Sequence, residues 1–172
     1  MNNSYNLPPE SRVQFWVRWT ITLAWAATIF LLSTGTYAGS FSEMLLRYIL
    51  NFLHFTVTLQ TFLVLHHVFR KLAHLTEYGI FGMLLYHCFL NSNQTEWRAK
   101  TAAWAVLVAG LYSLTDEFHQ IFVPGRGPAL TDCGIDTTGA TLAMLVIFVW
   151  TRVFGSRLPG AANPEDYPAV ST

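Results

Sequence analysis

Charged residues are scarce in this sequence. Asp, Glu, Lys and Arg make up only 12% of its 172 residues, whereas 52% of the residues are apolar. Soluble domains carry about 25% charged residues, so the composition argues against an ordinary soluble protein and is typical of a membrane protein of one domain. The formal net charge is zero and no basic block is present, so the electrostatic pattern of a nucleic-acid-binding protein is also missing.

Cysteines and motifs of known chemistry are few as well. The two cysteines, Cys88 and Cys133, lie in different apolar segments, which indicates small buried side chains and no disulfide framework. The sequence has no internal repeat, no H-E-x-x-H motif, no Gly-rich phosphate loop and no G-x-S-x-G elbow. Neither Ser113 nor Thr115 has the partners of a catalytic triad. No reaction can therefore be written from motifs alone.

Four long apolar runs are present, and each approaches the ~20 residues that cross a bilayer as a helix. They cover about residues 15–33, 72–90, 101–122 and 132–152. Trp16 and Trp19 are placed like interfacial anchors, and Arg18 can extend to the membrane surface. Because the first run is long and further membrane segments follow it, we interpret it as an uncleaved helix and not as a signal peptide. We predict an all-α integral membrane protein with four transmembrane helices.

The segments outside these runs are short. Residues 1–14 form a polar lead, residues 33–40 a turn-rich loop, and residues 153–172 a tail that is predicted to be disordered. Between residues 41 and 69 polar residues recur every three to four positions, which predicts an interfacial or amphipathic helical segment between the first two spans. Residues 57–69 could also lead into the second span as one long tilted helix or dip partly into the membrane.

The basic residues are distributed unevenly over the two sides of the membrane. With the N-terminus inside, six of the ten Lys and Arg residues lie on the inner side and four on the outer side. The inner loop at residues 91–100 is short and carries two of them, Arg98 and Lys100. The positive-inside rule therefore favours a multi-pass protein with both termini in the cytoplasm.

The polar residues of the spans gather at one end of the protein. Because consecutive spans alternate in direction, the start of the second span, the end of the third and the start of the fourth lie in the same leaflet. Carboxylates in such positions are costly unless they meet water, a cation or each other. Helical spacing groups these side chains on each helix. They are His74, Glu77 and Tyr78 on the second span, Tyr112, Asp116, Glu117, His119 and Gln120 on the third, and Asp132 and Asp136 on the fourth.

We predict that these groups form a small polar pocket near the outer surface of the membrane. The loop at residues 124–128 would close the pocket, and Lys71 and Arg126 would supply positive charge. Structural alternatives exist for each part: His74 and Glu77 could form only an interhelical hydrogen-bonded pair, and Arg126 could bind headgroup phosphates. The joint arrangement favours a functional site. A cluster of His, Glu and Asp can bind a divalent cation or move protons as general acid and base.

Three segments resemble the VanZ-like family of small bacterial membrane proteins. They are K-L-A-H-L-T-E-Y-G-I-F-G at Lys71–Gly82, L-Y-S-L-T-D-E-F-H-Q-I-F-V-P-G-R at Leu111–Arg126 and D-C-G-I-D-T-T-G-A at Asp132–Ala140. The D-E-x-x-Q-x-F-x-P-x-R core makes the resemblance specific, and it covers roughly residues 15–152, the expected membrane domain. Arg70 departs from the pattern, since the family usually has an acidic residue there. The family's motif positions fall on Lys71, His74, Tyr78, Gly82, Asp116, Glu117, Gln120, Arg126, Asp132, Asp136 and Gly139.

The resemblance implies a multi-pass protein of the bacterial cytoplasmic membrane with a role in the cell envelope. The founding member of the family is associated with low-level resistance to the glycopeptide teicoplanin. The implied partners are membrane lipid, a lipid-linked cell-wall precursor or a lipoglycopeptide. The family name does not supply a molecular activity.

Four interpretations of the pocket remain open. It could bind or shield an envelope component, through the residues Lys71, Glu77, Tyr78, Gln120, Arg126, Asp132 and Asp136. It could be an enzyme that modifies a lipid-linked or peptidoglycan precursor, with Asp116 or Glu117 as base beside His74 or His119. It could be a metal-dependent form of that enzyme. A proton-coupled transporter is the least favoured, because four spans without a repeat are unusual for one.

Overall fold

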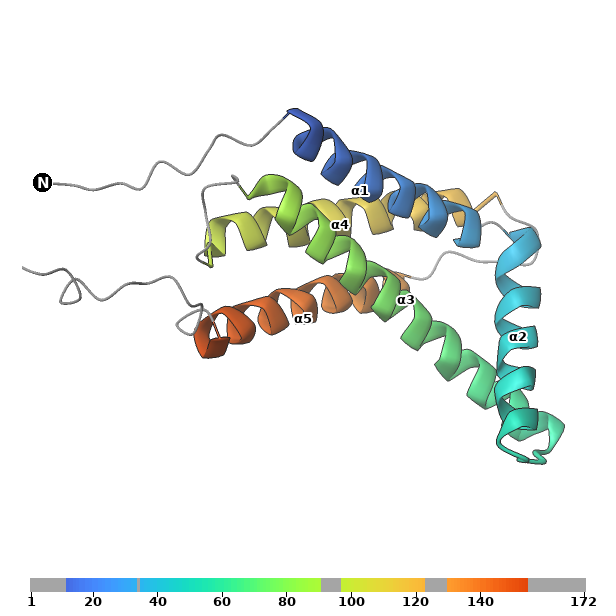
Figure 1. Cartoon of the computed structure of the whole chain (residues 1–172). Helices are drawn as coiled ribbons and strands as arrows, with labels where there is room; N and C mark the ends of the chain where they lie inside the picture. Colours follow the sequence, from blue (N-terminus) through green and yellow to red (C-terminus); the bar gives the residue numbers. More distant parts are fainter. Residues whose placement is uncertain (1–11, 34, 91–96, 123–129, 155–172) are drawn as a thin grey trace, which may run out of the picture.

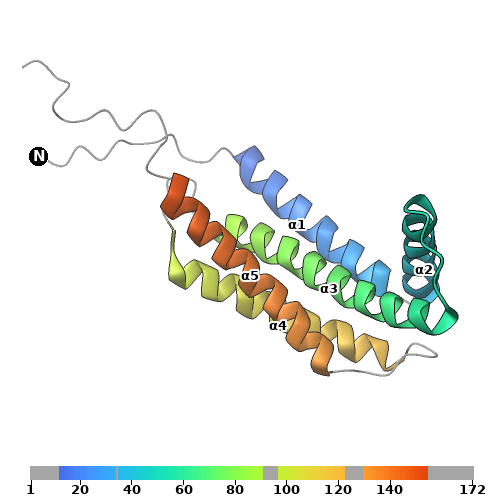
Figure 2. The same cartoon turned by 90° about the horizontal axis from the view of Figure 1, so that it is seen from below.

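The computed structural model describes residues 12–33, 35–90, 97–122 and 130–154. These residues form five α-helices and no β-strand, so the predicted all-α class is confirmed. α1, α3, α4 and α5 run side by side as a bundle, and α2 crosses one end of it (Figure 1, Figure 2). The helices are α1 (Arg12–Ser33), α2 (Gly35–Phe52), α3 (Leu59–Phe89), α4 (Ala99–Gln120) and α5 (Leu130–Phe154).

The first connection differs from the prediction. A turn-rich loop was expected at residues 33–40, but α1 ends at Ser33 and α2 begins at Gly35. Glycine lowers helix stability by about 1 kcal/mol, and this weak preference is overridden here because α2 packs against both α1 and α3. α2 is the most amphipathic of the five helices, as the spacing of its polar residues predicted. Helix α1 also begins earlier than expected, at Arg12, inside the predicted polar lead.

The chain reverses between α2 and α3 through a tight cap. His54 has a left-handed backbone with φ of 57°, and its N–H donates to the carbonyl of Asn51. The N–H of Phe55 donates to the carbonyl of Leu50, which completes a Schellman motif. α3 then begins after Thr58, whose hydroxyl accepts from the N–H of Thr61. This stop was not predictable from the sequence, because glycine or asparagine usually occupies the left-handed position and histidine stands here.

Helix α3 is the centre of the bundle and contacts all four other helices. It is one continuous helix of 31 residues, so the segment at residues 59–69 continues into the predicted second span without a break. Its closest neighbour is α5, along a line of small residues that we call the glycine seam. The seam consists of Gly79 and Gly82 of α3 and Gly139, Ala140 and Ala143 of α5.

The glycine seam brings two backbones into direct contact. A methyl group added to Gly139 would lie within 3.1 Å of the backbone of Leu75, and one added to Gly82 would lie 3.1 Å from Ala140. Such distances leave no room for a Cβ atom at Gly139. This kind of small-residue packing is how helices approach closely in membrane proteins, where side-chain burial alone gives little driving force.

The end of the bundle opposite to α2 has an apolar core. The rings of Tyr86 and Trp97 stack with centroids 5.4 Å apart, and Phe148 meets Trp97 edge to face. Arg18 of α1 donates to the carbonyls of His87 and Leu90 at the end of α3, at 3.2 and 3.5 Å. A cation is favourable there, because the C-terminal end of a helix carries partial negative charge.

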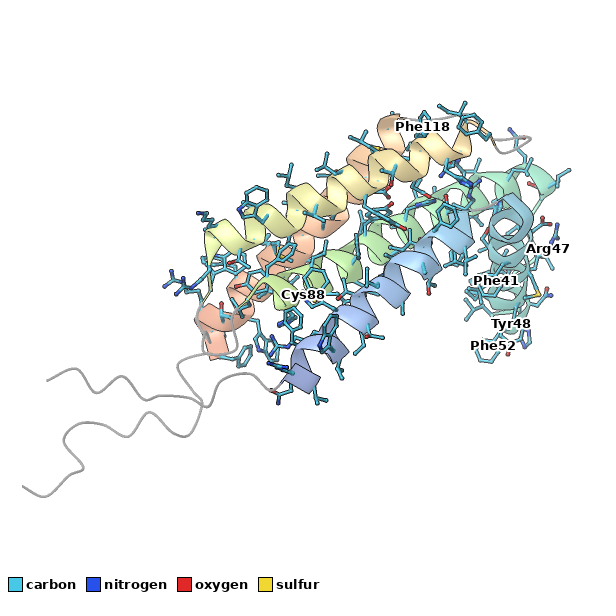
Figure 3. All side chains as sticks on the ribbon, turned by 90° about the horizontal axis from the view of Figure 1, so that it is seen from above. Phe41, Arg47, Tyr48, Phe52, Cys88 and Phe118 are labelled. Atoms are coloured by element: carbon cyan, nitrogen blue, oxygen red, sulfur yellow. The ribbon has the colours of Figure 1, made fainter. Side chains whose placement is uncertain are left out.

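The outer surface of the described helices is apolar. Exposed side chains such as Phe118 of α4 point away from the bundle, and α2 exposes Phe41, Tyr48 and Phe52 (Figure 3). By length and composition, two helices could cross a membrane, one over Arg12–Ser33 and the other over Thr131–Phe154. α3 and α4, which carry the predicted second and third spans, do not meet this criterion among the described residues.

Candidate functional site

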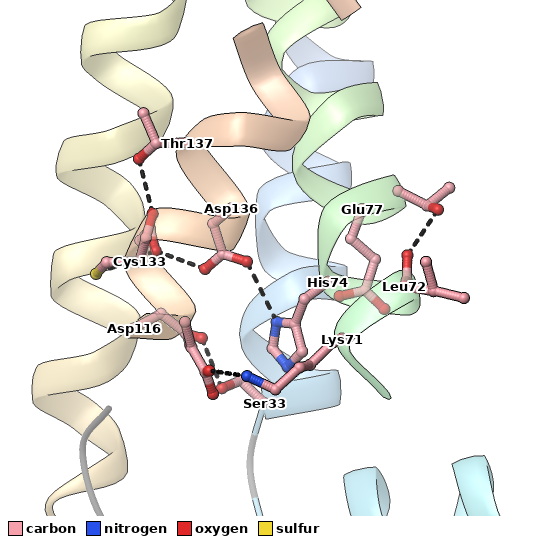
Figure 4. Close-up of polar contacts among 12 residues, drawn as sticks. Ser33, Lys71, Leu72, His74, Glu77, Asp116, Cys133, Asp136 and Thr137 are labelled. Carbon is pink, nitrogen blue, oxygen red and sulfur yellow. Dashed lines mark hydrogen bonds and ion pairs between the residues drawn. The ribbon is translucent and has the colours of Figure 1, made fainter. Parts of the chain in front are cut away.

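The predicted polar groups meet inside the bundle, at the end that α2 crosses. The end of α1, the middle of α3, the end of α4 and the start of α5 all contribute side chains to this space (Figure 4). We call it the polar chamber. It is formed by Ser33, His74, Glu77, Ser113, Asp116, Glu117, Gln120 and Asp136.

One set of hydrogen bonds joins α4 to α1. The hydroxyl of Ser33 donates to Oδ2 of Asp116 at 2.7 Å. The amide of Gln120 donates to the Ser33 oxygen at 2.9 Å and to the same carboxylate oxygen at 3.2 Å. All three side chains are buried, and Asp116 and Gln120 lie one helical turn apart on α4. The last residue of α1 is thereby fixed to the acidic end of α4.

A second set joins α4, α5 and α3. The hydroxyl of Ser113 donates to Oδ2 of Asp136 at 2.5 Å, and Oδ1 of Asp136 lies 3.6 Å from Nδ1 of His74. Asp136 is only 1% exposed. The carboxylate, and not the imidazole, is therefore the group next to the hydroxyl. This order differs from a Ser-His-Asp triad, in which the imidazole takes the proton of the nucleophile.

The interior of the chamber is rich in carboxylates. Glu117 is 4% exposed and Asp116 is 3% exposed. Glu77 is close enough to Asp116 for their charges to interact, and Asp136 is similarly close to both Asp116 and Glu117. Several like charges in one buried space are unfavourable unless protons or cations accompany them. The geometry is therefore suited to hold a proton or a positively charged group.

The rim of the chamber carries one ion pair. Nζ of Lys71 lies 3.4 Å from Oδ1 of Asp132, and both side chains are partly exposed. Lys71 thus balances one acid, as the sequence predicted, but the acid is at the rim and not in the interior.

Most of the predicted site residues are brought together, and a few are not. Tyr78 is fully buried beside the chamber, with its ring 6.4 Å from that of Tyr112. The hydroxyl of Tyr112 points towards α1 and donates to the carbonyl of Ala26. His119 packs its ring against Phe30, with centroids 4.6 Å apart. Arg126 and the expected closing loop at residues 124–128 lie outside the described residues.

Two serines of the chamber were missed by sequence reasoning. Ser33 lies at the end of the first span, which alternation of direction places in the same leaflet as the three polar ends. Ser113 lies three residues before Asp116 and so shares its helical face. Both signals were present in the sequence. Serine is common in membrane helices and bears no charge, so Ser33 was not singled out, and Ser113 was considered only as a nucleophile without triad partners.

Within the described residues, no group of three or more His, Cys, Asp or Glu side chains is arranged so that it could hold a metal ion. The divalent cation that the sequence left possible therefore stays a hypothesis.

A small cavity opens next to the chamber, between the end of α1, α2 and α3. Its volume is about 190 Å³. Its polar lining comes mainly from Arg70, His74 and Glu77, and its other walls are largely apolar. A larger and more open groove of about 930 Å³ lies between α4 and α5, but its lining is mainly apolar and small residues. Of these two spaces, the cavity beside α2 is the one lined by charged side chains of the chamber and its surroundings.

The comparisons with known proteins agree with the motif pattern. Neither the curated proteins nor the solved structures give a match to this chain. The sequence model of the family described as VanZ/LLP1 matches residues 18–151, which include all five helices apart from the first turns of α1 and the end of α5. The match covers the residues of the polar chamber and of the glycine seam, and the chain belongs to the VanZ/LLP1 family.

Proposed function

We propose that this protein is a multi-pass protein of the bacterial cytoplasmic membrane whose polar chamber binds part of an envelope component. By binding or shielding that component, the protein lowers the susceptibility of the cell to teicoplanin-type lipoglycopeptides. The observation that carries the proposal is the reversed polarity of the bundle. Carboxylates such as Asp116, Glu117 and Asp136 are buried inside, while large apolar side chains cover the outside.

This reversed polarity supports four spans, formed by α1, α4, α5 and the second half of α3. A soluble protein rarely exposes a large contiguous apolar surface, whereas a lipid-facing one must. α4 directs Asp116, Glu117 and Gln120 inwards and exposes residues such as Trp104 and Leu111. The second half of α3 is surrounded by other helices, so little of its surface would face lipid. The modest hydropathy of α3 and α4 is thus consistent with helices that cross a membrane inside a bundle.

The distribution of basic residues supports an outward-facing chamber. With both termini in the cytoplasm, the end of α1 and the start of α5 lie at the outer surface. α2 is at that same end (Figure 1), and so is the chamber, because the end of α1 and the start of α5 contribute to it (Figure 4). An outer position is where a protein meets lipid-linked cell-wall precursors and antibiotics that bind them.

The size of the cavity restricts what can enter it. A volume of about 190 Å³ is below the roughly 300–1,000 Å³ of sites for drug-sized ligands. A whole lipoglycopeptide is larger than such ligands. The proposed role is therefore to bind a polar headgroup of the envelope and not to enclose the antibiotic.

Susceptibility to teicoplanin tests this proposal. Susceptible Gram-positive cells would express the wild-type chain, Glu117→Ala or Arg126→Ala. A third variant, Leu145→Ala, serves as a matched control, because Leu145 is on the outer face of α5 and 54% exposed. Wild type and Leu145→Ala are expected to raise the inhibitory concentration of teicoplanin, and the other two variants are expected to lose the effect. Membrane abundance of every variant is measured in the same cells.

The absence of protection by wild type at matched expression would contradict the resistance role. Equal protection by all four proteins would show that the chamber has no part in it.

An enzymatic role is the alternative, and the contact between His74 and Asp136 is the observation that favours it. A histidine beside a buried carboxylate can move protons. In this alternative Asp116 or Glu117 acts as base and a lipid-linked or peptidoglycan precursor is modified. A changed mass of the cell's lipids or muropeptides on expression would identify the product. Unchanged profiles beside teicoplanin protection would favour binding, and stoichiometric metal in the purified protein would favour a metal-dependent reaction.

A further inference from the structure

The cavity beside α2 contains two opposite charges that are not paired with any described residue. Arg70 and Glu77 both line it. Among the described residues, neither the guanidinium of Arg70 nor the carboxylate of Glu77 takes part in a hydrogen bond or an ion pair. Only the backbone carbonyl of Glu77 is engaged, by the indole N–H of Trp25 at 3.0 Å.

The spacing along α3 explains why these two charges do not pair. Ion pairs within a helix form between residues three or four positions apart. Arg70 and Glu77 are seven positions apart, which corresponds to about 10 Å along the helix axis. His74 lies between them in the sequence and lines the same cavity, and its Nδ1 is 3.6 Å from Oδ1 of Asp136 on α5. The two charges thus line one cavity at positions about two helical turns apart.

The other walls of the cavity are largely apolar and come from three helices. Leu32 of α1, Leu45 of α2 and Ala73 of α3 line the cavity together with Phe41 and Phe69. Such walls suit a short alkyl linker. The proximity of Asp116 to Glu77 adds negative potential at the inner end, while Arg70 makes the outer end positive. The cavity therefore has an electrostatic direction along α3.

From this arrangement we infer that the cavity binds the headgroup of a phospholipid that carries both a phosphate and a primary amine, of the phosphoethanolamine type. The phosphate contacts Arg70 and the ammonium group donates to Glu77. The inference rests on the proposed function and names the kind of envelope component that the site binds. The acyl chains remain outside the cavity, in the lipid that surrounds the bundle.

Headgroups with only one of these features fit less well. A purely anionic headgroup would engage Arg70 and leave Glu77 facing Asp116 without a cation. A choline headgroup has a positive charge but no N–H with which to donate to a carboxylate. A charge-assisted hydrogen bond is worth enough to change affinity by about tenfold or more. The amine should therefore be recognised specifically.

Lipid retention by the full-length protein tests the inference. The protein is purified in detergent, mixed with equal amounts of ethanolamine, choline and glycerol phospholipids of the same acyl chains, and analysed by native mass spectrometry. Wild type is expected to retain the ethanolamine lipid about tenfold better than the choline lipid. Soluble O-phosphoethanolamine is expected to displace the lipid at concentrations at which inorganic phosphate does not.

Variants of equal size separate the two contacts. Glu77→Gln should abolish the preference for ethanolamine over choline but still retain phospholipid, whereas Arg70→Gln should reduce retention of every phospholipid. Arg47→Gln is the matched control, because Arg47 is an exposed arginine of α2 that pairs with Glu43 outside this cavity. It should behave as wild type. Size-exclusion profiles establish that each variant is folded.

Equal retention of the three lipids by wild type would overturn the inference, and so would an unchanged preference in Glu77→Gln. The proposed function fails separately, through loss of teicoplanin protection. A protein that protects cells but retains the glycerol phospholipid best would keep the proposed function and contradict this ligand.

Discussion

The glycine seam and the polar chamber lie next to each other on α3 and α5 but are held together differently. In the seam, the backbones touch and no polar side chain takes part. In the chamber, the helices are joined by side-chain hydrogen bonds around buried carboxylates. The seam leaves no free space, whereas the chamber opens into a cavity. The seam therefore fixes the distance between the two helices, and the chamber uses this distance to place chemical groups.

The two regions are coupled through neighbouring residues. Gly139 follows Asp136 by one helical turn on α5, and it contacts Leu75, which is adjacent to His74. The close approach at Gly139 therefore sets the 3.6 Å distance between His74 and Asp136. A change in the seam should disturb the chamber, while a change in the chamber should leave the seam intact.

The largest effect is expected for Gly139→Ala. The added methyl group would meet the backbone of Leu75, which cannot move aside as a side chain can, so the free energy of unfolding should fall by about 3 kcal/mol. Thermal unfolding of the purified protein in detergent measures this change. Gly134→Ala is the matched control on the same helix, because no atom lies within 4 Å of its added methyl group. Equal unfolding midpoints for the two variants would show that the seam is not tightly packed.

A smaller effect is expected for Asp136→Ala. The substitution removes the acceptor of the Ser113 hydroxyl and the partner of His74, and a buried polar group left without its partner costs about 2 kcal/mol. Asp136→Asn keeps the shape and an acceptor oxygen, so it should lose less than half as much. The same unfolding measurement compares them. If the alanine variant were as stable as wild type, the bonds of Asp136 in the chamber would contribute no structural stability.

The bond between α1 and α4 should contribute less. Ser33→Ala removes the hydroxyl that links Asp116 and Gln120, at a cost of about 1 kcal/mol. Thr28→Ala is the control, since the hydroxyl of Thr28 bonds only to the backbone of its own helix. Hydrogen exchange of α1, followed by mass spectrometry, should increase in the first variant and not in the second. Faster exchange in both variants would show that losing either hydroxyl destabilises α1 itself. The bonds between Ser33 and the chamber would then not be the cause.

The smallest effect is expected at the rim. Lys71→Met breaks the pair with Asp132, and both side chains are partly exposed, so the stability should change by about 0.5 kcal/mol or less. Added salt should reduce even this difference. Unfolding at low and high salt checks both statements. If Lys71→Met lowered the free energy of unfolding as much as Asp136→Ala, the pair at the rim would be as important for stability as the bonds inside the chamber.

The helices of the bundle were largely predictable from the sequence. The runs at residues 101–122 and 132–152 are bounded by polar, proline and glycine residues, and α4 and α5 occupy them within two residues at each end. The start of α2 was not predictable, because Gly35 and the residues after it favour turns and only packing makes them helical. The extension of α3 back to Leu59 was left open, since periodicity does not distinguish one long helix from two.

The composition of the chamber followed from topology, but its bonding did not. Alternation of the spans placed His74, Asp116 and Asp136 at one end without any knowledge of contacts. The sequence could not indicate that Ser33 and Gln120 share one oxygen of Asp116, because that depends on side-chain rotamers. It also could not indicate that the ring of His119 packs against Phe30. Helical spacing places a residue on a face, while the partner on the next helix is set by packing.

The length of α3 has a further consequence for the surrounding lipid. A helix of 31 residues is about 46 Å long, whereas the hydrocarbon layer is about 30 Å thick. Tilting alone within the usual range of about 0–40° does not absorb this hydrophobic mismatch. If α3 crosses the bilayer as proposed, its first turns overhang the bundle at the level of the headgroups, where they meet α2 (Figure 1). The protein then occupies a wider area in the outer leaflet than in the inner one. The outer leaflet is locally thinner beneath the overhang, and the inner leaflet is not affected.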